Sequence, residues 1–208
     1  MSGFDLVVAL AVGYLLGGFP TAALAARLRG KRIFDVGSGN MGAMNTARNL
    51  GFGVGVAVLA VDVAKGSVAV LLGLAMANAV GASAAASLAL GSSAGVAAIV
   101  GHAWSPYVGF RGGKALATGF GTTLPLFPWG GLAGLTLLVA LVLILRRVTL
   151  ATILTLLAFP LLTYLATMRA TLDQDMAFAA ATAALVSAAV IAFKHLLVWR
   201  AERRTRVR

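Results

Sequence analysis

Long apolar runs separated by short polar segments make up almost the whole chain. A helix needs about 20 residues to cross a hydrocarbon core about 30 Å thick, and seven runs reach or approach that length. They are Phe4–Ala26, Phe52–Ala77, Ala84–Val100, Ala115–Phe127, Gly131–Leu145, Thr149–Thr167 and Met176–Phe193. The fourth run is short because Pro125 and Pro128 stop it, and Pro160 predicts a kink in the sixth. The pattern predicts an all-α integral membrane protein of about seven transmembrane helices in one polytopic domain, residues 1–208.

Composition agrees with a membrane location. Of the 208 residues, 60% are hydrophobic and 11% are charged, and the mean hydropathy is +0.95. A soluble domain of this size cannot bury so much apolar surface. The sequence contains no cysteine, which excludes a disulfide framework, a thiolate metal site and a cysteinyl thioester intermediate. We expect no metal and no cofactor.

The basic residues predict the orientation of the chain. Short cytoplasmic loops carry an excess of Lys and Arg, and an outer N-terminus puts all 17 basic residues except Lys65 and Arg169 in inner segments. The basic C-terminal tail, 194–208, is then cytoplasmic, and the polar motifs face the cytoplasm as well. The net charge of +11 does not indicate nucleic acid binding, because no basic helix or aromatic ladder accompanies it. No nucleic acid partner is therefore expected.

The polar segment Val36–Gly51 has the composition of an anion-binding active-site loop. Glycine backbone N–H groups can approach a ligand closely, and hydroxyl, amide and guanidinium groups add further donors. The residues of these kinds are Gly37, Ser38, Gly39, Asn40, Gly42, Asn45 and Arg48. An alternative is that the glycines only let transmembrane helices approach closely.

Three glycines of this segment also match the dinucleotide-binding spacing Gly-x-Gly-x-x-Gly, and Asp62 follows at about the expected offset. That fingerprint requires a preceding strand and a βαβ unit. Here a long apolar run and the basic segment 27–32 come before it, and Asp62 lies inside another apolar run. We therefore exclude dinucleotide binding.

A second polar segment, Gly101–Thr118, contains Arg111–Lys114, with the sequence RGGK, just before an apolar run. Two glycines and a cation at a helix N-terminus form an arrangement that binds phosphate. The segment is not a Walker A loop, because Val108 and Ala115 occupy the positions that need Gly and Ser or Thr. His102 is a candidate general base or phosphate ligand; the alternative is an amphipathic anchor at the membrane interface.

Three smaller polar groups complete the pattern. Arg146–Thr152 has two arginines at an inner helix end, which either determine topology or act in the site. Lys194–His195 opens the basic tail. Asp62 and Lys65 are three residues apart in an apolar run, so they share a helix face and can pair. Intramembrane ions are usually functional, but both lie about three helical turns beyond the first polar segment. We interpret them as a buried pair that orients their helix against that segment.

These segments resemble the signatures of the bacterial membrane acyl-phosphate:glycerol-3-phosphate acyltransferases of the PlsY type. Gly37–Gly51 is similar to the first signature, SGNxGATN with an Arg three residues on. Gly101–Thr118 is similar to GHxFSxFxxFxGGKGVAT, and Arg146–Ile153 to RYVSLASI. Tyr14–Pro20 and Asp62–Gly66 also fit, so the resemblance covers nearly the whole chain in the right order.

The sequence departs from these signatures at several positions, and most of the changes are conservative. The departures are Met41, Met44, Ala115, Leu116, Arg147, Thr149 and Thr152. The family usually has Gly where Ala115 stands. The terminal signature usually has Asn three residues after its His, but Val198 follows His195 at that offset, so one polar contact expected from the family is missing.

The resemblance implies a seven-span enzyme of the bacterial inner (cell) membrane with its active site facing the cytoplasm. It implies transfer of an acyl group from acyl phosphate to the sn-1 hydroxyl of glycerol 3-phosphate, giving lysophosphatidic acid and phosphate for phospholipid biosynthesis. The implied catalytic residues are Ser38, Asn40 and His195, and the implied substrate-binding residues are Gly39, Asn45, Arg48, Gly101, His102, Gly112, Gly113, Lys114 and Thr149. The expected partners are the two substrates and the lipid bilayer.

Two other functions fit parts of the pattern. A small-anion transporter also uses glycine loops and intramembrane charges, but it typically shows inverted repeats, and the sequence has no such internal similarity. A catalytically weakened membrane scaffold is supported by Val198 alone. The donors retained in the other polar segments argue against the scaffold.

Overall fold

The computed structural model describes residues 2–206, with side chains up to residue 200. The end of the predicted basic tail, residues 207–208, lies outside the described residues. Within 2–206 every regular element is a helix, which confirms the predicted all-α class. The chain divides into two compact units, Met1–Thr122 and Thr123–Arg208.

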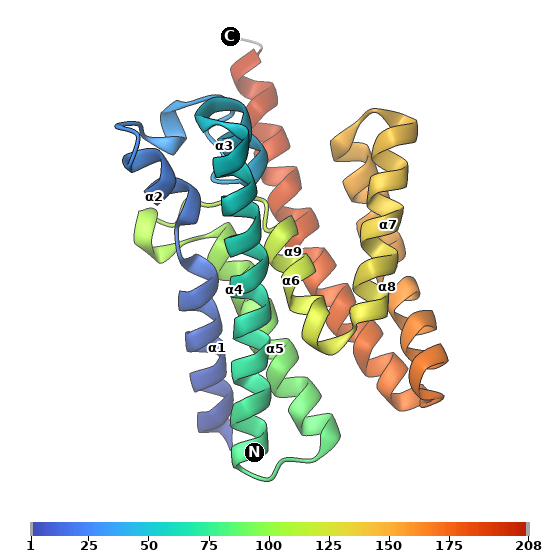
Figure 1. The fold of residues 1–208 in the computed structure, drawn as a ribbon. Coiled ribbons are helices and arrows are strands. Elements are labelled where there is room, and N and C mark those ends of the chain that lie inside the picture. The colour runs from blue at the N-terminus through green and yellow to red at the C-terminus, as the bar shows by residue number, and fades with distance from the viewer. Residues whose placement is uncertain (1, 207–208) are drawn as a thin grey trace. The chain divides into compact units, whose positions relative to one another are not determined.

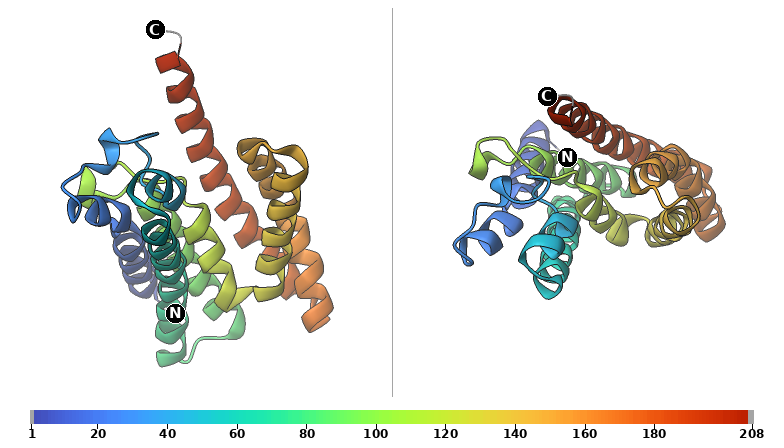
Figure 2. Two further views of the ribbon diagram at one scale, coloured as in Figure 1. Left: turned by 45° about the horizontal axis from the view of Figure 1, so that its top comes forward. Right: turned by 90° about the horizontal axis from the view of Figure 1, so that it is seen from above.

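The first unit is a bundle built around three long helices. Helices α1 (Gly3–Gly18), α4 (Phe52–Ala79) and α5 (Ala84–Ala103) contact one another and lie side by side (Figures 1 and 2). Its shorter elements are α2 (Thr21–Arg27), η1 (Ile33–Asp35), α3 (Ala43–Leu50), η2 (Pro106–Val108) and the first part of α6 (Leu116–Leu126). Both α2 and α3 contact α4 and lie at one end of the bundle (Figure 1). The two predicted polar segments therefore belong to this unit.

Glycines bring α1 and α5 into close contact. A Cβ on Gly13 would overlap the carbonyl group of Ala94, and a Cβ on Gly17 would overlap the backbone of Ala98. Small residues on both helices let the two backbones approach in this way. The contact fixes the end of α5, from which the second polar segment starts.

The first predicted span, Phe4–Ala26, is two helices rather than one. Helix α1 ends at Gly18, and Phe19 has φ −51° and ψ 121°, outside the helical region. Pro20 supplies no N–H and its ring disfavours a helical residue before it. Hydropathy depends on side-chain polarity and not on backbone conformation, so the break is not visible in the apolar run.

The second unit consists of three further helices. They are α7 (Pro128–Leu145), α8 (Val148–Thr171) and α9 (Gln174–Arg206). Helix α8 contacts both α7 and α9. Gly130 of α7 lies against Thr163 of α8, and Gly134 lies against the ring of Phe159. Pro160 lies inside α8, and α9 continues the last apolar run into the basic tail (Figure 1).

Six helices of the described chain are long and apolar enough to cross a membrane, judged by length and composition. They are Gly3–Arg27, which joins α1 and α2, Phe52–Ala79, Ala84–Ala103, Pro128–Leu145, Val148–Thr171 and Gln174–Arg200. Helix α6, the predicted fourth span, has 11 residues and is about 16 Å long at about 1.5 Å per residue, roughly half of a hydrocarbon core. Seven spans and the orientation of the termini remain predictions.

Candidate active site

The side chain of Asn45 organises the first polar segment. Its carboxamide oxygen accepts the Ser38 N–H at 3.0 Å and a bond from the Asn49 side chain at 2.9 Å. Its nitrogen donates to the carbonyls of Val36, at 3.1 Å, and Asn40, at 3.0 Å. These bonds use both donor protons and both lone pairs of the amide group. Asn45 therefore holds the loop closed and has no amide hydrogen-bonding capacity left for a ligand.

Two glycines give this loop its shape. Gly37 and Gly39 adopt φ values of +57° and +63°, a region that strongly favours glycine. A Cβ on Gly37 would overlap the side chains of Asn45 and Asn49, and a Cβ on Gly39 would lie 2.9 Å from the carbonyl oxygen of Phe34. Glycine is needed at both positions for conformation and for space, and the residue between them is exposed.

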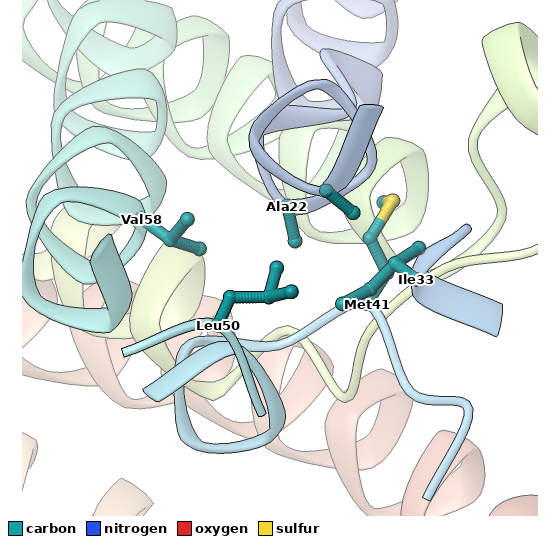
Figure 3. Packing of buried hydrophobic residues seen from close by; sticks show 6 residues of the cluster. Ala22, Ile33, Met41, Leu50 and Val58 are labelled. Atoms are coloured by element: carbon teal, nitrogen blue, oxygen red, sulfur yellow. The ribbon is translucent and has the colours of Figure 1, made fainter. Parts of the chain in front are cut away.

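A buried apolar cluster packs against the first polar segment. Side chains from α2, η1, the loop, α3 and α4 meet there (Figure 3). The cluster consists of Ala22, Ala26, Ile33, Met41, Leu50 and Val58. Met41 is 1% exposed, so this departure from the family signature is a core side chain. The cluster joins the loop to α2 and α4.

Half of the predicted loop is helical. Ala43–Leu50 forms the amphipathic helix α3, which corrects the expectation of a sixteen-residue loop. Asn45, Thr46 and Leu50 form its buried face, and Arg48 is exposed in its last turn. Two turns between flanking glycines are too short a stretch for the helical period to stand out in the sequence. The helix presents Arg48 away from the apolar cluster.

Asn40 carries an unused acceptor. Its backbone carbonyl accepts from Asn45 and from the Gly42 N–H, the latter at 2.9 Å. Its side-chain oxygen is buried and has no hydrogen-bond partner among the described residues. Leaving a buried polar atom unsatisfied costs about 1–3 kcal/mol. This oxygen is therefore a candidate acceptor for a ligand hydroxyl.

Ser105 organises the second polar segment. Its N–H donates to the Arg111 carbonyl at 3.2 Å, and its carbonyl accepts the Phe110 N–H at 2.8 Å. Its hydroxyl donates to the carbonyl of Gly18 at 2.6 Å. Ser105 is fully buried, so it closes the segment into a loop and attaches that loop to the C-terminal end of α1.

The two polar segments meet at Gly113. Its N–H donates to the His102 carbonyl at 3.1 Å. A Cβ on Gly113 would lie 2.7 Å from the Met41 carbonyl oxygen and would overlap Nε2 of the His102 ring. A Cβ on Gly112 would overlap the carbonyl oxygen of His102. The glycine pair therefore lets the second segment lie directly against the first, next to a buried histidine ring.

The Arg111 side chain links the second polar segment to η1, which comes just before the first polar segment. Its guanidinium carbon lies 3.8 Å from the centre of the Phe34 ring, a cation–π contact worth about 0.5–1 kcal/mol at an exposed site. Sequence reasoning treated Arg111 only as part of the glycine motif. The sequence around Arg111 does not indicate this partner ring, because Phe34 lies in η1, far away along the chain.

Gly101 lies in the contact between helices rather than beside the polar loops. A Cβ there would overlap the Tyr14 carbonyl oxygen and would lie 2.8 Å from the Gly18 nitrogen. Close approach of α1 and α5 accounts for this glycine. Its predicted role in substrate binding stays a prediction with a structural alternative.

Asp62 and Lys65 form the predicted buried ion pair. Lys65 Nζ lies 2.9 Å from Asp62 Oδ1, and both side chains are almost fully buried, so the predicted pairing is confirmed. The predicted neighbour of the pair is wrong. Lys65 donates to the Phe19 carbonyl at 3.1 Å, and Asp62 lies 3.4 Å from the Thr21 hydroxyl. The pair thus orients α4 against the break between α1 and α2.

Known proteins match this chain over most of its length. A family model for "Glycerol-3-phosphate acyltransferase" covers residues 7–201. The chain belongs to the glycerol-3-phosphate acyltransferase family. This confirms the family that the sequence motifs indicate.

Individual members of the glycerol-3-phosphate acyltransferase family show the same relationship. The enzyme of Parasynechococcus marenigrum is 43% identical over 154 residues, which cover 74% of this chain and 69% of that protein. Glycerol-3-phosphate acyltransferase 1 of Deinococcus radiodurans is 45% identical over 134 residues, which cover 64% of each chain.

Two crystal structures of PlsY, an integral membrane glycerol 3-phosphate acyltransferase, share the fold. The glycerol 3-phosphate form has a TM-score of 0.73 and 27% identity, and it covers 97% of this chain and 91% of that chain. The lysophosphatidic acid form has a TM-score of 0.72 and 26% identity, covering 91% and 87%. The present chain is thus an integral membrane protein with an acyltransferase fold.

Ala115, one of the departures from the acyltransferase signature, has an unusual backbone conformation. Ala115 has φ +59° and is 2% exposed. A Cβ in the left-handed region costs about 1–2 kcal/mol, and the glycine usual in the family carries no such cost. Ala115 therefore adopts a backbone conformation that favours glycine, the residue usual in the family at this position.

The remaining predicted residues of the acyltransferase site belong to the second unit. Thr149 is exposed in the first turn of α8. His195 is buried in α9, with Nδ1 3.0 Å from the Ile191 carbonyl oxygen. Val198, three residues on, is half-buried. The assignment of Thr149 and His195 to the active site stays a prediction.

Proposed function

We propose that this acyltransferase moves an acyl group from an acyl phosphate to the sn-1 hydroxyl of glycerol 3-phosphate, giving lysophosphatidic acid and inorganic phosphate. Membership of the family supports both the transferase activity and the acceptor. The contact between the two glycine-rich segments at Gly113 is the observation that supports the site most directly. The first segment provides Arg48 and the second provides Lys114 as a cation for a phosphate group.

The proposed reaction needs no covalent intermediate on the protein. The hydroxyl oxygen of glycerol 3-phosphate attacks the carbonyl carbon, the bond from that carbon to the phosphate oxygen breaks, and phosphate leaves with the electron pair. The hydroxyl proton passes to a phosphate oxygen of the substrate or to His195, the candidate base. No bond to the protein forms, so positioning and charge stabilisation supply the rate.

We divide the polar residues into proposed ligand contacts and supports. Arg48 and Lys114 bind the substrate phosphates, and the exposed Ser38 hydroxyl orients the attacking oxygen. The buried, unpartnered oxygen of Asn40 accepts a hydrogen from the same hydroxyl group. Asn45, whose amide is fully engaged within the loop, acts by holding Ser38 and its neighbours in place.

The glycines shape the site more than they donate to the ligand. The Gly39 N–H bonds the Val36 carbonyl at 3.0 Å, and the Gly113 N–H bonds the His102 carbonyl. Gly112 and Gly113 allow the second segment to approach the first. Their contribution to catalysis is therefore the placement of Lys114.

The membrane arrangement is proposed from the charges and the helices together. Counting α6 as a short span gives seven spans in a single polytopic domain, with the N-terminus outside and the C-terminus in the cytoplasm. The distribution of Lys and Arg supports this orientation. The active site then faces the cytoplasm at the inner membrane of a bacterium, and the acyl chain enters from the bilayer.

Release of inorganic phosphate from purified protein tests the proposed reaction. We expect release from acyl phosphate to depend on glycerol 3-phosphate and to match the lysophosphatidic acid formed. Release at the same rate without the acceptor, with no lysophosphatidic acid, would contradict the proposal.

A further inference from the structure

A buried series of polar contacts connects α4 with the second polar segment. Asp62 is 2% exposed and His102 is 3% exposed. Oδ1 of Asp62 lies 3.6 Å from Nδ1 of His102 and 2.9 Å from Nζ of Lys65. One carboxylate oxygen of α4 thus faces both its ion-pair partner and the histidine at the C-terminal end of α5.

The other side of the His102 ring lies against the glycine pair. Nε2 occupies the space that a Cβ of Gly113 would need, and the His102 carbonyl accepts the Gly113 N–H at 3.1 Å. The ring is therefore held between Asp62 and Gly113. A carboxylate beside Nδ1 favours the tautomer with its proton on that nitrogen, which leaves the Nε2 lone pair at the glycine.

The ion pair is satisfied without the histidine. Lys65 has the Phe19 carbonyl as a second partner, and Asp62 has the Thr21 hydroxyl. An ion pair that only fixed α4 to the break before α2 would not need to face α5. The contact of His102 with the same Asp62 oxygen therefore indicates that Asp62 has a further role.

We infer that Asp62 is a positioning residue for Lys114 and acts through the ring of His102. The inference rests on the proposed function, in which Lys114 binds a substrate phosphate. Lys114 follows Gly113 directly and precedes Ala115, whose φ is +59°. Gly113 is held against His102 on one side of Lys114, and Ala115 has a left-handed backbone on the other. A rotation of the His102 ring therefore displaces the backbone of Lys114 and, with it, the lysine side chain.

The first test replaces both members of the ion pair, because removing one would leave a buried charge unpaired. In Asp62→Asn/Lys65→Met the KM for glycerol 3-phosphate should rise roughly tenfold to a hundredfold, the range for a small misplacement of a binding group. The KM for acyl phosphate and the thermal midpoint in detergent should stay near wild type. Thr21→Val, which removes the hydroxyl beside Asp62, is the matched control and should keep the wild-type KM.

Coupling to Lys114 separates positioning from general loosening. Combined with Lys114→Gln, the paired substitution should raise the KM by less than about twofold further, because the contact it positions is already gone. Combined with Arg48→Lys, the two effects should multiply. If the increases in KM multiplied with Lys114→Gln as well as with Arg48→Lys, the inference would be overturned.

The outcomes also distinguish this inference from the proposed function. A wild-type enzyme without phosphate release dependent on glycerol 3-phosphate would overturn the proposed function. An active wild type whose paired variant keeps its KM would overturn the role of Asp62 alone. Should the paired variant accumulate poorly in membranes, Asp62→Asn/Lys65→Gln keeps an amide pair at the position and carries the same expectation.

Discussion

At the residue scale, Arg48 and Lys114 are the cations assigned to the substrate phosphates. Replacing either with Ala removes a charge-assisted contact worth about 1.5–3 kcal/mol, so the KM for glycerol 3-phosphate should rise roughly tenfold to a hundredfold. Steady-state kinetics of purified variants measure this. Arg169→Ala, an exposed change in the second unit, is the control and should behave as wild type. A wild-type KM in either variant would remove that residue from the site.

Ser38 and Asn45 are neighbours in the same loop with different expected roles. Ser38→Ala removes an exposed hydroxyl and should lower turnover with little change in protein yield. Asn45→Ala removes four hydrogen bonds, three of which close the loop, so stability should fall by about 1–3 kcal/mol together with activity. Yield in membranes, thermal midpoint and turnover distinguish the two. Equal losses of yield and turnover in Ser38→Ala would mark Ser38 as structural.

Ala115 offers a gain of stability. Ala115→Gly removes a Cβ from the left-handed region and should stabilise the protein by about 1 kcal/mol. Ala140→Gly, in the middle of α7, is the matched control and should cost about 1 kcal/mol. Thermal unfolding in detergent measures both. A lower midpoint in Ala115→Gly would contradict the strained backbone at this position.

Sequence patterns revealed the residue types of the site better than their roles. Signature matching drew attention to Asn45 as a ligand contact, but its bonds lie within the loop. The stack of Arg111 on Phe34 had no signal, because the two residues come from different segments. Such contacts depend on how distant segments meet, and local composition does not encode that.

At the element scale, hydropathy predicted helix positions well and backbone breaks poorly. Helices α4 and α5 begin at Phe52 and Ala84, as predicted. The division of the first span at Pro20 and the helix α3 were missed. An apolar run stays apolar across a proline, and the eight residues of α3 are too few for the helical period to show.

The contact between α1 and α5 gives a prediction at the same scale. A Cβ on Gly101 would overlap the Tyr14 carbonyl, so Gly101→Ala should lower the thermal midpoint and the yield in membranes. The fraction that folds should keep the wild-type KM. Gly53→Ala is the control, because a Cβ there meets no atom within 4 Å. A raised KM with normal stability would instead place Gly101 in substrate binding.

At the scale of the whole molecule, we expect the acyl chain and the phosphate groups of the substrates to bind in different environments. Apolar spans can take an acyl chain directly from the bilayer, while the glycine-rich segments suit compact phosphate groups. A coenzyme A thioester carries an adenosine nucleotide that needs a sizeable cytoplasmic surface. The longest inner segment before the C-terminal tail runs over residues 27–51 and includes Val36–Gly51, and nothing in it resembles an adenine pocket. Acyl phosphate is therefore the expected donor.

The choice of donor tests this account most directly. Purified protein in detergent or lipid is given labelled glycerol 3-phosphate with acyl phosphate or with acyl-coenzyme A, and labelled lysophosphatidic acid is measured. We expect product from acyl phosphate and none above background from acyl-coenzyme A. Product formed from acyl-coenzyme A at a rate equal to or above that from acyl phosphate would contradict the account.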